Sequence, residues 1–579
     1  MEMVNIKING VPVEAPKGST ILEAARIAGI EIPTLCFLKD INEIGACRIC
    51  VVEVKGARSL VASCVYPINN GMEVFTNTPR VLKSRKTTLK LILSNHNKSC
   101  LSCVRSGNCE LQKLCKDLGV EDENYYKGAM TESEIDCSAA HMIRDNSKCI
   151  LCRRCTAVCA KTQDVGVIGA NERGFKTIIG TSFENDLADT SCVSCGQCIA
   201  VCPTGALHEK EAIDDVFAAI ADPEKTVLVQ TAPAVRAGLG EAFGLPIGTD
   251  VEGKMAAALR RLGFDKVFDT DFAADLTIME EATEFLHRVK NGGKLPLITS
   301  CSPGWIKYCE HYFPDMLDNL SSCKSPMQMF GATAKTYYAQ KMGLDPKNIV
   351  VVAIMPCTAK KFEIGRDDQD AAGMPDVDFS LTTRELGRMI EKAGIKFLDL
   401  PDEKFDAPLG LSTGAAVIFG ATGGVMEAAL RTAVETLTGE ELKALDFTDV
   451  RGTAGIKEAS YDVAGLNVKV AVVSGLANAK EVLNKVRNGE ADYQFIEIMA
   501  CPGGCVNGGG QPQQPAFIRN TVDIRAKRAK VLYDIDASMP IRKSHENPAI
   551  KEVYAEFFGE PGSEKAHHIL HTTYVNRGL

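Results

Sequence analysis

Cysteine is the residue type whose number and spacing most clearly suggest chemistry in this chain. The sequence has 579 residues and 23 cysteines, of which 17 precede residue 203 at short, repeating intervals. Disulfides are disfavoured, because the chain is long, shows no export signal and carries CxxC pairs, which in cytosolic proteins usually mean metal or redox chemistry. Thiolates bind iron strongly, so the intervals predict iron-sulfur clusters that pass single electrons.

The first group of cysteines has the spacing C-x10-C-x2-C-x13-C and comprises Cys36, Cys47, Cys50 and Cys64. Its CxxC pair could hold one iron of a 2Fe-2S cluster while the two distant cysteines hold the other iron. A structural zinc ion is the alternative. The strand and helix pattern that precedes the group favours the 2Fe-2S cluster.

A histidine accompanies the second group, which reads His96, Cys100, Cys103 and Cys109 in the pattern H-x3-C-x2-C-x5-C. A lone histidine is usually a surface or core residue, but one placed three residues before a CxxC pair is a candidate ligand. Neutral imidazole in place of a thiolate makes a 4Fe-4S cluster less negative and alters its reduction potential.

The third group is a repeat with the spacing C-x2-C-x2-C-x3-C. Its eight members are Cys149, Cys152, Cys155 and Cys159, followed by Cys192, Cys195, Cys198 and Cys202. This spacing is typical of a ferredoxin with two 4Fe-4S clusters, in which the fourth cysteine of each run ligates the other cluster. We therefore expect Cys202 to join the first three cysteines and Cys159 to join the second three. Zinc is again the alternative.

Three more cysteine motifs follow apolar, strand-like runs in the second half of the chain. They contain Cys301, Cys357 and the pair Cys501 and Cys505. Because parallel strands end at one edge of a sheet, the motifs are expected to meet there and form a shared metal site.

These last motifs, TSCSPGW, MPCTAKKFE and EIMACPGGCVNGGG, resemble the three signatures of FeFe-hydrogenases. The N-terminal groups resemble those of the large clostridial-type members, and those of NADH dehydrogenase subunits. The resemblance implies an H-cluster, in which Cys357, Cys501 and Cys505 hold a 4Fe-4S cubane. Cys505 would bridge to a di-iron unit that carries carbonyl, cyanide and an azadithiolate. The implied reaction is the reversible conversion of two protons and two electrons into H2.

The resemblance also implies which residues surround the H-cluster. Lys360 would donate to a cyanide ligand, Met355 and Met499 would form a soft apolar wall, and glycines 508 to 510 would let backbone approach the cofactor. Plain core packing is the alternative for the methionines. The other residues implied at the cofactor are Ala232, Pro233, Ala234, Pro326 and Phe419.

Proton transfer is implied to run through Cys301, Glu281, Ser321 and Glu284, with the bridging amine as the last base. Glu281 and Glu284 are one helical turn apart, so they could share a helix face. A solvated surface is the alternative position for both carboxylates.

The chain departs from the family pattern at Ser302, where a second cysteine is usual. Either Ser302 ligates the cubane through oxygen, or Cys301 shifts over to ligate and leaves the proton step to Ser302 or water. Thiolate is the better ligand for iron, but the alignment of the motif favours Ser302. Ala234 and Met327 are smaller departures, at positions where serine and glutamine are usual.

The elements that position these groups predict a multidomain chain of α+β and α/β parts. Residues 1–79 read as a β-grasp 2Fe-2S ferredoxin-like domain, with a hairpin at Asn9-Gly10 and a capping box at Thr20 and Glu23. Residues 80–125 form the histidine-ligated domain, with a helix from Arg80 to His96. Residues 126–210 form the two-cluster domain, which should lie nearest the active site, and 211–520 form a two-lobed α/β H-cluster domain. Residues 521–579 are expected to form a helical segment that packs around the H-cluster domain and resembles a hydrogenase small subunit.

The remaining cysteines and the histidine-rich tract have no predicted catalytic role. Cys115, Cys137, Cys309 and Cys323 are expected to be buried thiols. The tract at 567–571 could bind metal, although a structural role is expected.

The net charge of -9 and the pI near 5.7 make nucleic acid an unsuitable partner. No apolar run approaches the roughly 20 residues of a membrane span, so a cytoplasmic protein is expected. No G-x-G-x-x-G follows a strand, so NAD(P) and flavin would bind to partner subunits, with ferredoxin as the other expected electron partner. Hydrogenase maturation proteins are implied as well. A sensory protein of low activity is the main alternative, and an electron-transfer dehydrogenase subunit would not need the motifs around Cys357 and Cys501.

Overall fold

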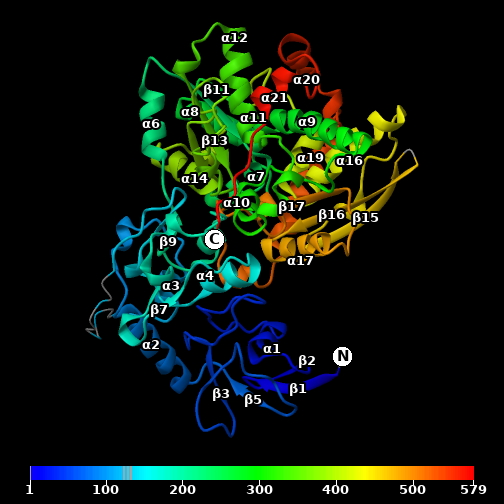
Figure 1. Ribbon diagram of the computed structural model, residues 1–579. Helices are drawn as coiled ribbons and strands as arrows, with labels where there is room; N and C mark the ends of the chain where they lie inside the picture. Colours follow the sequence, from blue (N-terminus) through cyan, green and yellow to red (C-terminus); the bar gives the residue numbers. More distant parts are fainter. Residues whose placement is uncertain are drawn as a thin grey trace.

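The computed structural model describes residues 2–121, 124, 126, 130, 133–463 and 465–578, and the predicted domain boundary at residue 125 lies outside them. The N-terminal domain lies at one end of the molecule, a cysteine-rich middle part follows, and a large α/β domain occupies the other end (Figure 1). Within the described residues, no helix combines the length and apolar character that crossing a membrane requires.

The N-terminal domain is built on a five-stranded sheet in the order β2-β1-β5-β3-β4. Its strands are β1 (Met3–Ile8), β2 (Val11–Pro16), β3 (Val51–Val54), β4 (Val61–Ala62) and β5 (Glu73–Phe75). The predicted hairpin is confirmed, with positive φ angles of 50° at Asn9 and 83° at Gly10. The predicted capping box at Thr20 and Glu23 opens α1 (Ile21–Ile27). Apolar residues that alternate along β1 form the core beneath this helix.

Two helices follow, α2 (Pro79–Leu93) and α3 (Glu110–Asp117). The prediction that the first would run to His96 was wrong, because α2 ends at Leu93. The Ser94 hydroxyl donates to the Leu91 carbonyl at 2.7 Å, a local bond that competes with continued helix. His96 therefore lies in the loop beyond the helix.

The cysteine repeat lies on a small unit with two matching short helices, α4 (Arg154–Ala157) and α5 (Gln197–Val201). Two antiparallel pairs frame it, β6 (Met142–Arg144) with β9 (Leu207–Glu209) and β7 (Gly169–Asn171) with β8 (Ile178–Gly180).

The α/β domain contains two four-stranded sheets. The first, in the order β11-β10-β13-β14, is parallel and consists of β10 (Thr226–Thr231), β11 (Lys266–Asp269), β13 (Ile349–Met355) and β14 (Phe379–Thr382). The second, in the order β12-β17-β16-β15, consists of β12 (Leu297–Ile298), β15 (Ile456–Val463), β16 (Leu466–Ser474) and β17 (Phe495–Met499). The strand-like runs predicted before the late cysteine motifs are strands.

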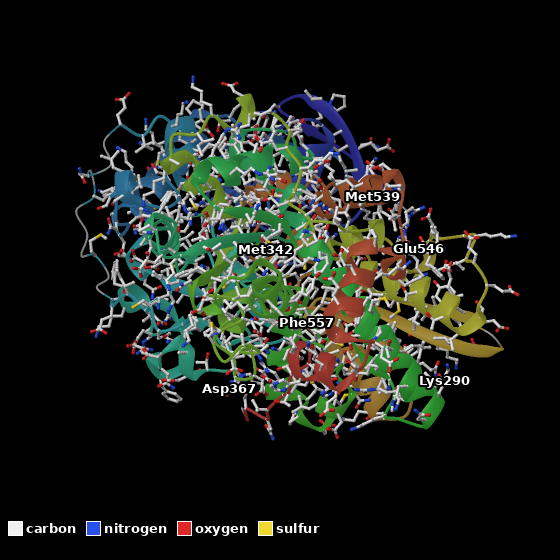
Figure 2. The ribbon with its side chains drawn as sticks, turned by 90° about the horizontal axis from the view of Figure 1, so that it is seen from above. Lys290, Met342, Asp367, Met539, Glu546 and Phe557 are labelled. Carbon is white, nitrogen blue, oxygen red and sulfur yellow. The ribbon has the colours of Figure 1, made fainter. Side chains whose placement is uncertain are left out.

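Helices complete the α/β domain. The long helix α9 (Thr270–Asn291) packs against α11 (Pro326–Thr333) and α16 (Gly424–Thr438). The C-terminal segment supplies α19 (Ile524–Ser538), α20 (Pro548–Val553) and α21 (Glu564–Leu570). Figure 2 shows this segment, with Met539, Glu546 and Phe557, running along the α/β domain. On α16, buried Arg431 pairs with Asp536 of α19 at 2.8 Å, which fixes the segment to the domain.

Candidate functional site

The cysteines of the three late motifs meet around one buried cavity in the α/β domain. About 820 Å³ of space at this cavity, part of it open to solvent, is not filled by protein atoms. Cys301, Cys357, Cys501 and Cys505 all line it, and so does Ser302. β13 ends two residues before Cys357 and β17 two residues before Cys501, so the ends of two strands bring these thiols together.

The cavity wall is almost entirely apolar, which suits a metal cluster better than free thiols. Burial raises the pKa of Cys505 to about 12, and it raises the pKa of Cys357 and of Cys501 as well. The neighbouring thiols raise the pKa values of Cys501 and Cys505 further. Bound iron would reverse this balance, because a metal cation deprotonates the thiols that ligate it. The residues present therefore fit a cluster held by Cys357, Cys501 and Cys505.

Most of the other residues expected at the cofactor also line the cavity. They are Ala232, Pro233, Pro326, Met327, Met355, Lys360, Phe419 and Met499. The Lys360 ammonium donates to Glu363 at 2.7 Å and to Ser325 at 2.8 Å, so it is fixed at the wall. Thr270, Ala274 and Cys195 also line the cavity, although the sequence analysis did not place them there.

Three residues expected at the cofactor are not among those that line the cavity. Ala234 packs instead with Val417, Val506 and Leu532, because α7 (Pro233–Arg236) turns it toward α19. Gly509 and Gly510 lie against other parts of the protein: a Cβ on Gly509 would lie 2.2 Å from the Cys195 carbonyl oxygen, and one on Gly510 would lie 2.9 Å from Thr382.

Gly509 marks where the two-cluster unit reaches the cavity. A Cβ on Gly196 would lie 3.2 Å from the Gly509 Cα, so the two backbones touch. The Thr358 hydroxyl donates to the Ser194 carbonyl at 2.8 Å, and Cys195 lines the cavity itself. The prediction that the two-cluster unit lies next to the active site is confirmed.

The eight cysteines of that unit surround two small cavities in the predicted grouping. Cys159 lines one cavity with Cys192, Cys195 and Cys198, and Cys202 lines the other with Cys149, Cys152 and Cys155. Each run therefore contributes its fourth cysteine to the other cavity.

Both outer cysteine groups approach the cavity around Cys152 and Cys202, so the arrangement is forked rather than linear. The Asn42 side chain donates to the Cys36 carbonyl at 2.8 Å and to the Cys152 carbonyl at 2.9 Å. On the other side, a Cβ on Gly205 would lie 2.5 Å from the Cys103 sulfur. The spacing of the cysteines does not predict this fork.

His96 fits the role of a ligand in the second group, with Cys100, Cys103 and Cys109. Burial lowers the pKa of His96 to about 4, so the imidazole is neutral and keeps a lone pair for a metal. Its buried Nδ1 has no hydrogen-bond partner among the described residues.

The cysteines of the first group do not pair as expected. The expectation was that Cys47 and Cys50, the CxxC pair, hold one iron together. The sulfurs of Cys50 and Cys64 lie 3.3 Å apart, and the Cys36 sulfur accepts from the Cys47 amide at 3.5 Å. The pairing of β3 with β4 contributes to this, because it brings Cys50 opposite Ser63, whose amide donates to the Cys50 carbonyl at 3.2 Å, and so places Cys64 next to Cys50. Among the remaining cysteines, Cys309 and Cys323 are buried as expected, whereas Cys137 is exposed.

The predicted proton-relay residues lie beside the cavity rather than on a solvated surface. Glu281 on α9 is 1% exposed, and burial together with the charge of Glu284 raises its pKa to about 8. The Ser321 hydroxyl donates to Glu284 at 2.9 Å and lies within hydrogen-bonding reach of Glu281. Burial and the charge of Glu281 raise the pKa of Cys301, which lines the cavity. Arg288 pairs with Glu284 at 2.5 Å at the outer end.

Cys301 and Ser302 face different neighbours. The Ser302 hydroxyl accepts from the Ala500 amide at 3.2 Å, next to Cys501. Ser302 opens α10 (Pro303–Tyr312), and a Cβ on Gly304 would lie 3.1 Å from Ala500 and 3.7 Å from Cys195. Ser302 therefore lies on the side of the two-cluster unit, whereas Cys301 lies toward Glu281.

Replacing Cys195 with alanine tests whether electrons reach the cavity through the neighbouring cluster. For the H2 chemistry that the cysteine motifs imply, we expect Cys195→Ala to lose that cluster and most viologen-driven H2 evolution, while H2/D2O exchange, which needs no external electrons, is retained. Electron paramagnetic resonance of the reduced protein would count the clusters. Cys309→Ser, at a buried thiol away from the cavities, is the control. If the variant lost H2/D2O exchange although the infrared spectrum of the active-site cofactor stayed intact, the expected route of electrons through the Cys195 cluster would be contradicted.

Known families match most of the chain in successive parts. Residues 225–509 match the family described as iron only hydrogenase large subunit, C-terminal domain, and residues 522–577 match iron hydrogenase small subunit. Residues 1–79 match a 2Fe-2S iron-sulfur cluster binding domain and 148–206 a 4Fe-4S dicluster domain. Residues 85–124 match the NADH-ubiquinone oxidoreductase-G iron-sulfur binding region.

Two similar proteins match nearly the whole chain, and a solved structure matches the larger part of it. The chain is 53% identical to the NADP-reducing hydrogenase subunit HndD of Solidesulfovibrio fructosivorans over 100% of both chains. It is 45% identical to iron hydrogenase 1 of Clostridium pasteurianum over 99% of this chain and 100% of that one. A solved structure of a variant of the apo [FeFe]-hydrogenase HydA1 of Chlamydomonas reinhardtii is 43% identical with a TM-score of 0.57, over 64% of this chain and 100% of that chain. The chain therefore belongs to the FeFe-hydrogenase large-subunit family and is an iron hydrogenase preceded by iron-sulfur domains.

Proposed function

We propose that this iron hydrogenase converts two protons and two electrons into H2, and the reverse, in the cavity where Cys301, Cys357, Cys501 and Cys505 meet. The convergence of these thiols in one apolar cavity beside Cys195 is the observation that carries the proposal. The H-cluster supplies the iron at which electrons and protons combine. Cys357, Cys501 and Cys505 would hold its cubane, and Ser302 is positioned to complete the set.

Four further clusters are proposed, one 2Fe-2S and three 4Fe-4S. Their ligand sets are the Cys36 group, the His96 group and the two interleaved sets of the cysteine repeat. The contacts of Asn42 and Gly205 support a forked relay with two outer arms. The domain boundaries proposed from the sequence place these sets in 1–79, 80–125 and 126–210, ahead of the catalytic domain at 211–520 and the wrap at 521–579.

The protein's own residues move the protons. The buried Glu281 carboxyl, with its pKa raised to about 8, exchanges a proton with the Cys301 thiol on the cavity side. Ser321 connects Glu281 to Glu284, which Arg288 holds at the outer end. Lys360 provides a positive charge at the cavity wall, and the apolar lining excludes water.

The electron partner is proposed to be ferredoxin, subunits that bind flavin and NAD(P), or both. A relative of equal length is named as a subunit of an NADP-reducing hydrogenase, which supports partner subunits. Maturation proteins would supply the di-iron unit, and a cytoplasmic location is proposed with them.

Infrared spectroscopy of the matured protein tests the function. Carbonyl and cyanide bands are expected together with viologen-driven H2 evolution. Ser302 favours one competing function, a sensory protein of low activity. Bands without appreciable turnover would support that alternative, and absence of the bands after maturation would contradict both.

A further inference from the structure

Three potential metal ligands from separate segments meet beside the proposed proton relay. They are Glu284 on α9, Cys323 before α11 and His571 after α21, and one ligand atom of each lies within 4.8 Å of the other two. The Cys323 sulfur lies 3.9 Å from Glu284 Oε2. Cys323 and His571 are buried, and Glu284 is half-buried. A thiol, an imidazole and a carboxylate form the kind of set that zinc prefers.

Backbone hydrogen bonds fix the positions of two of these ligands. The Lys324 amide donates to the Leu570 carbonyl at 2.8 Å, and the Thr572 amide donates to the Ser322 carbonyl at 2.8 Å. Cys323 and His571 therefore lie opposite each other in a short antiparallel bridge. In Figure 1, α21 lies beside α9 and α11, which flank this bridge.

The hydrogen bonds of His571 indicate which ring nitrogen could bind a metal in place of its present partner, the Ser322 hydroxyl. Its Nε2 lies 3.2 Å from Glu280 Oε2, and that carboxylate also accepts from the Gly562 amide at 2.9 Å and from the Tyr554 hydroxyl. Because Nε2 donates to Glu280, Nδ1 keeps its lone pair, which accepts from the Ser322 hydroxyl at 2.8 Å. Histidine ligands of zinc often donate a hydrogen bond from their other ring nitrogen to a carboxylate, which orients the imidazole.

We propose that Glu284, Cys323 and His571 bind Zn²⁺, and that the bound ion blocks proton movement through Glu284. The second part rests on the proposed function, in which Glu284 is a relay residue. Zinc bonds of about 2.0 to 2.3 Å place ligand atoms roughly 3.3 to 3.8 Å apart, so the side chains need to move by about 1 Å. On binding, the Cys323 thiol loses its proton to solvent and the thiolate forms the Zn–S bond.

The surroundings can accommodate this change. When Glu284 turns to the ion, the Arg288 guanidinium keeps the carbonyls of Leu320 at 2.8 Å and Asp318 at 3.1 Å as acceptors. Apart from the cysteine groups assigned to iron-sulfur clusters and the active site, two other groups of possible metal ligands lie close together in the described part of the chain, and neither includes a thiol. In one of them, Glu435 with His545 and Glu546, the Lys543 ammonium already lies 2.6 Å from Glu435.

Zinc binding is tested directly on the full chain with its clusters in place. One equivalent of zinc chloride is added, and equilibrium dialysis and zinc-edge X-ray absorption report the binding and the ligands. We expect one sulfur ligand together with nitrogen and oxygen ligands. The dissociation constant should rise about 10- to 100-fold in Cys323→Ser and in His571→Gln. The control variants Cys309→Ser and His545→Gln should bind zinc as the unchanged protein does.

Inhibition is measured as viologen-driven H2 evolution with increasing zinc, relative to the zinc-free rate of each variant. The unchanged protein should lose activity and recover it on adding EDTA, and Cys323→Ser should need at least about tenfold more zinc. Equal zinc binding in the unchanged protein and in Cys323→Ser would overturn the site. Binding through sulfur without inhibition would overturn the block and the relay role of Glu284. Protein without hydrogenase activity would contradict the proposed function, while the binding measurements would still test the site.

Discussion

Replacing Glu281 with glutamine is expected to lower H2 evolution by about 10³-fold, which is the range that a positioned proton-transfer group contributes. Glutamine preserves the size of the side chain but cannot release or accept the proton that passes between Ser321 and Cys301. Glu281 is 1% exposed, so bulk water does not replace it easily. The measurement is H2 formation with reduced viologen, together with the infrared spectrum to show that the active-site cofactor is intact.

The pH dependence follows from the raised pKa of Glu281. Burial raises that pKa to about 8, so the carboxyl is protonated below pH 8 and can donate toward the cavity. As the pH rises through about 8 the carboxyl ionises, and H2 evolution by the unchanged enzyme should fall. Glu281→Asp keeps a carboxyl group and should retain part of the rate with a similar pH profile.

A neighbouring carboxylate provides the matched control. Glu280 is also buried on α9, but it faces Tyr554 and Gly562 rather than Ser321. Glu280→Gln should therefore reduce stability by roughly 1 to 3 kcal/mol, through loss of charged hydrogen bonds, without the large loss in turnover. Equal losses in rate for the two variants would argue against a relay through Glu281.

The sequence predicted best the features that depend on local spacing. The interleaved cysteine runs imply which thiols meet, because a 4Fe-4S cluster accepts only ligands within a few ångströms, and the cavities group Cys159 and Cys202 accordingly. The apolar runs before Cys357 and Cys501 are strands, because few alternatives exist for short β-branched segments between turns.

Contacts between segments far apart in the chain could not be predicted from the sequence. Asn42 looks like an ordinary turn residue, and nothing local indicates that its amide, which donates to the Cys36 carbonyl, also reaches the Cys152 carbonyl 110 positions further along the chain. The side of α7 that Ala234 occupies depends on how α19 packs against it, which the periodicity of a four-residue helix cannot show. The grouping of Glu284, Cys323 and His571 likewise depends on a bridge between residues far apart in the chain.

Ser302→Cys is expected to raise both the iron retained at the active site and the rate of H2 evolution. The Ser302 side chain lines the same cavity as the three cysteines that would hold the cubane, and its hydroxyl accepts from the Ala500 amide, next to Cys501. A thiolate binds iron more strongly than a serine oxygen, and we expect an increase in rate of about tenfold, the lower end of what changes around a metal site produce. Iron analysis and the spectrum of the oxidised cofactor measure it.

Cys301→Ala separates the two ways in which this chain could complete its cubane. If Ser302 faces the cubane, as its contacts suggest, the variant should keep the iron but lose proton transfer, with a fall in rate of about 10³-fold. If Cys301 moves over to ligate, the same variant should lose iron and its cofactor spectrum as well. The position of Cys301 toward Glu281, whose charge helps to raise the pKa of the thiol, favours the first result. If Cys301→Ala lost iron, and if adding Ser302→Cys to that variant restored the iron, the result would instead show that this chain uses Cys301 as the ligand.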